Sequence, residues 1–254
     1  MYRGPGCFEA RLFRGPPRFG NMRPMLEPEV DPEALSAYRD PPGEAPWALP
    51  IVVRVEKGAE PDATAVAEAV AIAVARLLDD PRSAGGGEWA ADIGRWLDGR
   101  IRKVARRARG ARWVAAESVP GVTVEHRGAT ARAFVPTPAD AVPPEIGKLQ
   151  VAGLELEAGP MSPEQPGALE VALTPHVAMS PLKAAVQVAH AAQLARTTMN
   201  RRDLERWRTA GFGVRLVRPD AAQWARLAKS ARVVVRDAGY TEIPPGTRTT
   251  LALW

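Results

Sequence analysis

Hydrophobic and polar positions in the first half of the chain predict a strand, two helices and a hairpin. Residues 50–55 form a β-branched run typical of a covered strand, and residues 63–78 have the length and the Ala- and Val-rich composition of a buried helix. Residues 89–97 predict a second helix, and residues 122–135 predict a hairpin with Gly128 in its turn. The first half is therefore expected to fold as an α/β unit.

The second half repeats this order of elements. The expected elements are a strand over 169–173, helices over 181–195, 202–209 and 221–229, a strand over 233–235 and a closing hairpin. Pairs of identical residues lie 111 positions apart: Trp96 and Trp207, Trp113 and Trp224, Gly128 and Gly239, Thr130 and Thr241, Val122 and Val233, and Val124 and Val235. We interpret this offset as an internal duplication. The alternative is that two helix-to-hairpin units share tryptophans for generic packing.

The predicted fold class is α/β, with two similar units, each a small mixed β-sheet flanked by helices, packed as a pseudo-dimer within one chain, whose oligomeric state the sequence leaves open. Residues 1–47 are dense in Pro, Gly and Arg, and we interpret them as a disordered extension or as the result of a misplaced start codon. The N-terminal unit then covers 48–136 and the C-terminal unit 168–254. A Pro-rich connector, 137–167, joins them, with one short strand expected near 149–156.

Composition places the chain among ordinary soluble globular proteins. Of its 254 residues, 46% are hydrophobic and 25% charged, and no apolar run approaches the roughly 18 residues of a membrane span. The N-terminus is too rich in Arg, Gly and Pro for the apolar core of a secretory signal. The single cysteine, Cys7, permits no internal disulfide, which fits a cytoplasmic protein. The scattered histidines and cysteine have no metal-ligand spacing, so we expect no metal and no cofactor.

Positive charge is concentrated between Arg95 and Arg112. This segment holds eight cations and the single anion Asp98. Apolar residues at positions 101, 104, 105 and 108 predict an amphipathic helix that ends at Gly110. A solvated helix face usually mixes both signs of charge, so we favour a polyanion, tRNA, as the partner. The expected contacts are Arg100, Arg102, Lys103, Arg106, Arg107 and Arg109.

The end of the chain sets one carboxylate among turn residues. Asp237 follows the buried run 233–235 and stands two residues before Gly239, at a strand end of the kind that lines ligand crevices in α/β sheets. Taken alone, this segment slightly favours the alternative, an aspartate that caps its own turn by bonding to backbone amides.

The helix that opens the second unit carries polar residues along one edge. Ser180 and a proline begin this helix, and Lys183 falls in its first turn, where the helix dipole disfavours a cation. Lys183, Gln187 and His190 follow at i, i+4 and i+7. Singly they fit a solvated lysine and a core histidine, but together they predict a site that binds a phosphate or an oxyanion.

These two segments resemble the type II peptidyl-tRNA hydrolase family. The family pattern pairs a Met-x-x-Gly-Lys-x-Ala-x-Gln-x-x-His-Ala helix with a later Asp-Ala-Gly-x-Thr-x-Ile-x-x-Gly-Thr-x-Thr segment. The matching residues are Met179, Lys183, Ala185, Gln187, His190, Ala191, Asp237, Ala238, Gly239, Thr241, Ile243, Gly246, Thr247 and Thr249. Leu182 stands where the family has glycine, which puts substrate placement in doubt, and Pro181 replaces a common second lysine.

The resemblance implies a translation and ribosome-rescue enzyme that cleaves, with water, the ester between a peptide and the 3′ ribose of tRNA. It implies Lys183, Asp237, Thr241 and Thr249 as functional residues, supported by Gln187 and His190. We expect Asp237 to orient or deprotonate water, Lys183 to stabilise the oxyanion, and the two threonines to hold the substrate.

Two other functions remain open from the sequence. One is a non-catalytic module that binds tRNA or another RNA on a degenerate hydrolase fold, and the other is an ester or amide hydrolase with a different substrate. In the first unit, His126 stands where the offset would place Asp237. We therefore expect the second unit to hold the catalytic site and the first to contribute arginines.

Overall fold

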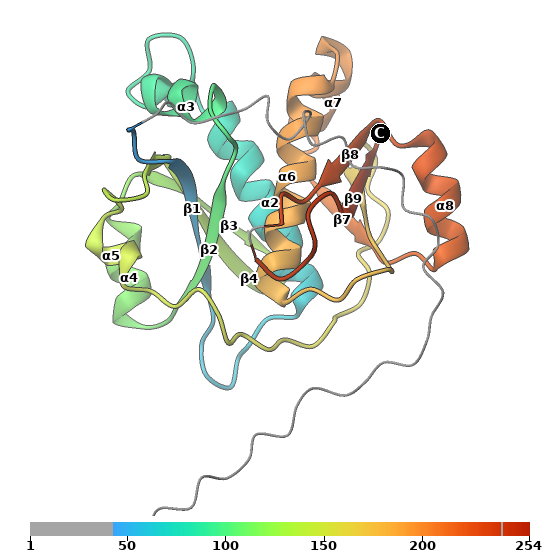
Figure 1. The fold of residues 1–254 in the computed structure, drawn as a ribbon, viewed down its shortest axis with the longest axis horizontal. Coiled ribbons are helices and arrows are strands. Elements are labelled where there is room, and N and C mark those ends of the chain that lie inside the picture. The colour runs from blue at the N-terminus through green and yellow to red at the C-terminus, as the bar shows by residue number, and fades with distance from the viewer. Residues whose placement is uncertain (1–42, 240) are drawn as a thin grey trace, which may run out of the picture.

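A computed structural model describes residues 43–239 and 241–254, so our interpretation of residues 1–47 falls almost wholly outside the described residues. The described part is mixed α/β and contains two mixed sheets flanked by helices, as Figure 1 shows. No helix within these residues has the length and apolar character that crossing a membrane requires.

The first sheet has four main strands in the order β2-β1-β4-β3. These strands are β1 (Trp47–Arg54), β2 (Lys103–Ala108), β3 (Gly121–His126) and β4 (Ala129–Phe134). β1 is parallel to β2 and antiparallel to β4, which forms the expected hairpin with β3. The short β5 (Thr137–Pro138) pairs with the start of β1.

The second sheet has the order β7-β6-β9-β8. Its strands are β6 (Leu169–Leu173), β7 (Val214–Val217), β8 (Val233–Arg236) and β9 (Arg248–Leu253). β6 is parallel to β7 and antiparallel to β9, and β8 and β9 are antiparallel. Each sheet thus sets one parallel and one antiparallel neighbour beside its first strand.

The helices also follow a common order in the two halves. Those of the first half are α2 (Ala63–Asp79), the 3-10 helix η1 (Pro81–Ser83), α3 (Ala90–Leu97), α4 (Ala111–Glu117) and α5 (Pro144–Gly147). Those of the second half are α6 (Pro181–Thr198), α7 (Arg201–Thr209) and α8 (Ala221–Ser230). The expected helices over 63–78, 89–97, 181–195, 202–209 and 221–229 are all present, with ends shifted by a few residues.

Helices α2 and α6 pack against each other between the two sheets (Figure 1). Both are rich in alanine, whose small side chain lets helices approach closely. α6 also contacts β2 of the first sheet, and α2 contacts β7 of the second. One hydrophobic core therefore includes both helices and residues from both sheets, such as Leu49 and Leu169.

The predicted basic helix over residues 95–112 is wrong. α3 ends at Leu97, β2 runs through Lys103–Ala108, and Gly110 precedes α4, with a positive φ of 51°, instead of ending a helix. Burial along β2 alternates at Lys103, Val104 and Ala105 (buried, half-buried, buried), which is the period of a strand. The spacing of apolar residues in this segment is compatible with a helix and with a strand. Hydrogen bonding to the buried strand β1 determines that the segment forms a strand.

Further details differ from the expectations. The short elements η1, α4, β5 and α5 were not predicted. Residues 149–156 form no strand of their own, and Gln150 makes only an isolated bridge to Arg107. β7 was not predicted, because its sequence Val214–Val217 is short and interrupted by Arg215.

Candidate functional site

A loop after β8 fixes the position of Asp237. The Asp237 N–H donates to the Thr247 carbonyl (3.0 Å) and the Asp237 carbonyl accepts from the Gly246 N–H (2.7 Å). Gly239 has a φ of 79°, and a Cβ there would lie 2.7 Å from atoms of Pro245. Only glycine fits this close turn without displacing it. Its N–H donates to Asp237 Oδ1 (2.8 Å), so the turn itself orients the carboxylate.

Lys183 reaches across from the first turn of α6 to this loop. Its Nζ lies 2.5 Å from Asp237 Oδ2 and donates to Thr241 Oγ1 at 2.9 Å. The Lys183 and Asp237 side chains are only 12% and 7% exposed. The carboxylate compensates both the burial of the ammonium and its unfavourable place near the helix N-terminus.

Gln187 and Thr249 extend the network behind Asp237. Gln187 Nε2 donates to Asp237 Oδ2 (2.7 Å), and the hydroxyl of Thr249 donates to Gln187 Oε1 (2.6 Å). Thr249 is fully buried, so its hydroxyl faces Gln187 and not the solvent. This bond orients the Gln187 amide with its NH₂ group toward Asp237.

The N-terminus of α6 is anchored to the same loop. The Ser180 side chain caps the helix by accepting from the Lys183 N–H (3.3 Å). Glu242 accepts hydrogen bonds from the Ser180 N–H (2.8 Å) and hydroxyl (2.6 Å). The start of α6 and the loop that carries Thr241 are therefore held together as one unit.

His190 does not join this network. Its Nδ1 lies 2.9 Å from Nζ of Lys103, on β2 of the first unit, and that ammonium also bonds to Gln193. Burial, and then the charges of Lys103 and Lys183, lower the pKa of His190 well below its usual value. Burial likewise lowers the pKa of Lys103. A neutral His190 ring can accept a hydrogen bond from Lys103, and so helps to join α6 to β2.

A cavity of about 680 Å³ lies over these groups and is bounded by both units. Lys183, Gln187, Asp237 and Thr241 line one part of it, and residues 100–105 line another. Leu182, at the family's glycine position, also lines the cavity, but its side chain is mostly buried in the core.

The six predicted tRNA contacts lie in different places. Arg100 and Arg102 line the cavity, and Lys103 is buried there. Arg106 points to the other face of the sheet, where it donates to the Leu149 carbonyl (3.2 Å). The remaining two, half-buried Arg107 and exposed Arg109, lie toward the end of β2 away from Arg100. Because successive side chains of a strand point to opposite faces of the sheet, these cations do not share one surface, as they would on one face of a helix.

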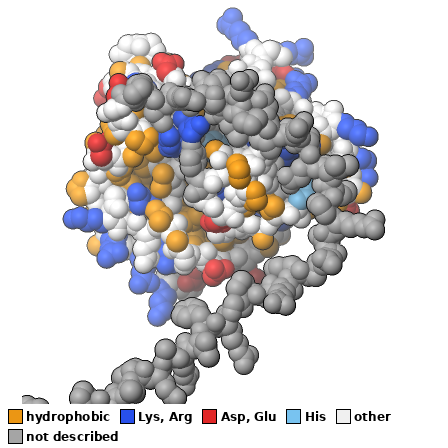
Figure 2. Space-filling model, viewed as in Figure 1, with side chains coloured by type: hydrophobic (Ala, Val, Ile, Leu, Met, Phe, Trp, Pro, Cys, Tyr) orange, Lys and Arg blue, Asp and Glu red, His pale blue; other side chains and the backbone are white. Residues whose placement is uncertain are grey.

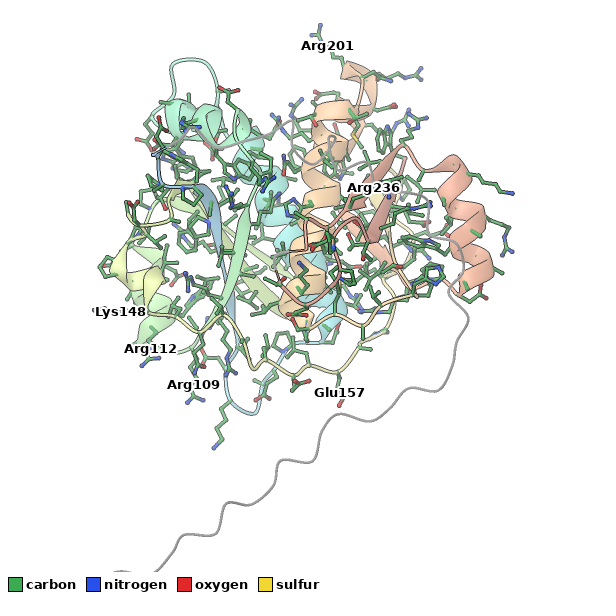
Figure 3. The ribbon with its side chains drawn as sticks, in the orientation of Figure 1. Arg109, Arg112, Lys148, Glu157, Arg201 and Arg236 are labelled. Carbon is green, nitrogen blue, oxygen red and sulfur yellow. The ribbon has the colours of Figure 1, made fainter. Side chains whose placement is uncertain are left out.

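Lys and Arg side chains on the face viewed in Figure 2 lie both at its edges and within it. Arg109, Arg112 and Lys148 lie together on the side of the first unit away from α6, whereas Arg236 lies beside α6 (Figure 3). Arg236 also lines the cavity.

In the first unit, the connector covers the N-terminal part of α2, which is the counterpart of the N-terminal part of α6. The Ala63 N–H, at the start of α2, donates to the Glu157 carbonyl (2.7 Å), and Ser162 donates to Glu68 (2.6 Å). His126 Nε2 lies 2.9 Å from Oε2 of the fully buried Glu68. In place of an open cavity, α2 thus meets an ordered segment of the connector.

Sequence reasoning missed two contributors to the site. Glu242 lay inside the recognised motif, at a position where the family pattern leaves the residue open. Lys103 was expected on an exposed helix face, and only the pairing of β2 with β1 places it against α6. The only sequence feature that indicated a strand here was the spacing of two between Lys103 and Ala105.

Comparison with known proteins agrees with the motif. Residues 171–254 match the family model of the peptidyl-tRNA hydrolase PTH2, which confirms the resemblance over this part of the chain. The first unit lies outside the match. No solved structure matches the chain.

Proposed function

We propose that the protein is a peptidyl-tRNA hydrolase that uses water to cleave the ester between a peptide and the 3′ ribose of tRNA, with its catalytic site in the second unit. One observation carries the proposal. Lys183 of α6 meets Asp237 and Thr241 of the loop after β8 at hydrogen-bond distance beside the cavity, within the region that matches the family.

The hydrogen-bond inventory of Lys183 supports an oxyanion role. An ammonium has three donors, and Asp237 and Thr241 take two of them. The third is free to meet the carbonyl oxygen of the ester as it becomes negative. A preorganised donor of this kind contributes about 10²- to 10³-fold to the rate.

The inventory of Asp237 supports a role in positioning water. A carboxylate has about four acceptor sites, and Lys183, Gln187 and the Gly239 N–H use three. The remaining site can hold a water molecule and take its proton as the water attacks the carbonyl carbon. General-base assistance contributes roughly 10²- to 10⁴-fold.

The two threonines then have different roles. Thr241 Oγ1 accepts from Lys183, so its own proton is directed elsewhere and can bind the substrate. Thr249 is buried and acts on Asp237 through Gln187, so we assign it a positioning role in place of the substrate contact expected from the family.

We also infer that the two units arose by duplication and that the first no longer has a catalytic role. The shared strand order and the covered N-terminus of α2 support this. In this account Arg100 and Arg102, at the cavity, bind the tRNA backbone.

The assay is release of peptide from purified peptidyl-tRNA by the wild type, Lys183→Met and the matched control Lys148→Met. Lys148 is an exposed lysine of α5's C-terminal end, remote from α6. We expect a loss of at least about 100-fold for Lys183→Met only. If the wild type binds peptidyl-tRNA tightly but releases no peptide, the protein is a non-catalytic RNA-binding module instead.

A further inference from the structure

β2 is one of the two edge strands of the first sheet, and part of its outer edge is open. The Leu49 N–H donates to the Arg102 carbonyl, and the Val55 N–H to the Ala108 carbonyl, both at 2.9 Å. Even-numbered residues of β2 therefore direct their backbone groups toward β1. By alternation, the N–H and C=O groups of the odd-numbered residues point away from the sheet.

The connector satisfies this edge at only one place. The Arg107 N–H donates to the Gln150 carbonyl (2.9 Å), after which the connector leaves the strand. Within residues 43–239 and 241–254, the outward backbone groups of Lys103 and Ala105 have no hydrogen-bond partner. Both residues are buried and line the cavity. Unpaired edge groups in a concave site are positioned to pair with another chain.

The edge of β2 runs beside α6, the helix that carries the proposed catalytic residue Lys183. Lys103 contacts His190, which is seven residues after Lys183 on the same helix. Seven helical residues span about 10 Å. An extended peptide covers that length with about three residues.

We propose that the peptide part of the substrate binds as an added strand on the β2 edge, through the backbone groups of Lys103 and Ala105, in the groove between β2 and α6. The inference rests on the proposed function, because it takes Lys183 and Asp237 as the point where the peptide's C-terminal carbonyl is held. Backbone pairing accepts any side chain, which suits an enzyme whose substrates carry different peptides.

The groove lining favours peptide over the single-stranded end of the RNA. Apolar side chains contribute to this lining, among them Ala105, Val151 and Val186. Among the described residues that line it, Phe, Tyr and Trp are absent, although such rings are what unpaired bases commonly stack on.

The test compares N-acetyl-aminoacyl-tRNA with N-acetyl-tetrapeptidyl-tRNA. We expect the wild type to have a KM about tenfold lower for the tetrapeptide substrate, since only that substrate reaches the edge. Ala105→Pro removes an outward N–H without removing a bond to β1, so the sheet is retained. This variant should lose the advantage of the longer peptide, so that its KM values for the two substrates become equal.

A second arm leaves the protein unaltered. N-methylation of successive amides in the tetrapeptide should weaken binding at alternate positions only, because alternate residues of an added strand face the edge. Equal KM values for the two substrates, or no alternation, would overturn the inference while leaving the hydrolase assignment intact. Competition by the trinucleotide CCA but not by free N-acetyl-tetrapeptide would assign the groove to RNA and overturn it too. Failure to cleave either substrate would instead reject the proposed function itself.

Discussion

The ammonium of Lys183 lies 2.5 Å from the carboxylate of Asp237, although 54 positions separate these residues in the chain. The pair joins the first turn of α6 to the loop after β8, and residues of both segments line the cavity. The two charges are mostly buried, so each is expected to depend on the other.

The pair should behave as one unit in a double-mutant cycle. Lys183→Met and Asp237→Asn are each expected to lower kcat by about 100-fold or more, and the double variant should lose little more than the worse single one. Single-turnover peptide release measures this. Fully multiplicative losses would mean that the residues act independently.

Thr249→Val should lower kcat by about tenfold without changing KM, because the Gln187 amide would lose the bond that orients it toward Asp237. The buried Gln187 oxygen would lose its partner, at a cost of about 1–3 kcal/mol in the free energy of unfolding. Thr249→Ser keeps the hydroxyl and should restore kcat. If valine and serine variants lose equal activity, the hydroxyl has no such role.

Stability in acid should depend on Glu68. Burial alone would raise the pKa of its carboxyl, but hydrogen bonds from His126, Ser162 and the Leu216 N–H hold that pKa below its usual value near 4.5. A lowered pKa in the folded state stabilises the fold above about pH 4.5, and that contribution is lost as pH falls through the folded-state pKa. Urea unfolding of Glu68→Gln should therefore show a shallower loss of stability below pH 4.5 than the wild type. Parallel curves would contradict this.

The cations at the cavity should govern the salt dependence of tRNA binding. Replacing Arg100 and Arg102 with Gln is expected to raise KM and to reduce the slope of log KM against log salt by about one to two units. Arg109 and Arg112, which are exposed on the far side of the first unit, provide the matched control pair. An equal change in slope for both pairs would place the tRNA elsewhere.

Much of the fold could be predicted from the sequence, and what was missed has a common cause. The long helices α2 and α6 are recognisable from their apolar, alanine-rich sequences, and their predicted positions and those of the central strands agree with the structure. Two of the strands not predicted, β2 and β7, take the same place beside β1 and β6. Arginines interrupt both, so neither segment shows a clean apolar alternation. Their conformation depends on pairing with a buried neighbour, which local sequence does not reveal.

The candidate site was predictable for a different reason. Lys183, Gln187 and Asp237 lie in a motif with fixed spacing, and the structure brings them together with Thr241. His190 and Thr249 belong to the same motif but face Lys103 and Gln187, away from Asp237. The direction of a side chain depends on which elements pack around it, and Lys103 comes from β2, a strand whose sequence predicts a helix.

The most direct test of the account is the single-turnover rate of peptide release by Asp237→Asn compared with His126→Asn. His126 ends β3, as Asp237 follows β8, and bonds to Glu68 of α2 as Asp237 bonds to Lys183 of α6. With folding checked by circular dichroism, we predict a loss of at least about 100-fold for Asp237→Asn and a near-normal rate for His126→Asn. Near-normal release by Asp237→Asn, or equal losses in the two variants, would contradict a catalytic site confined to the second unit.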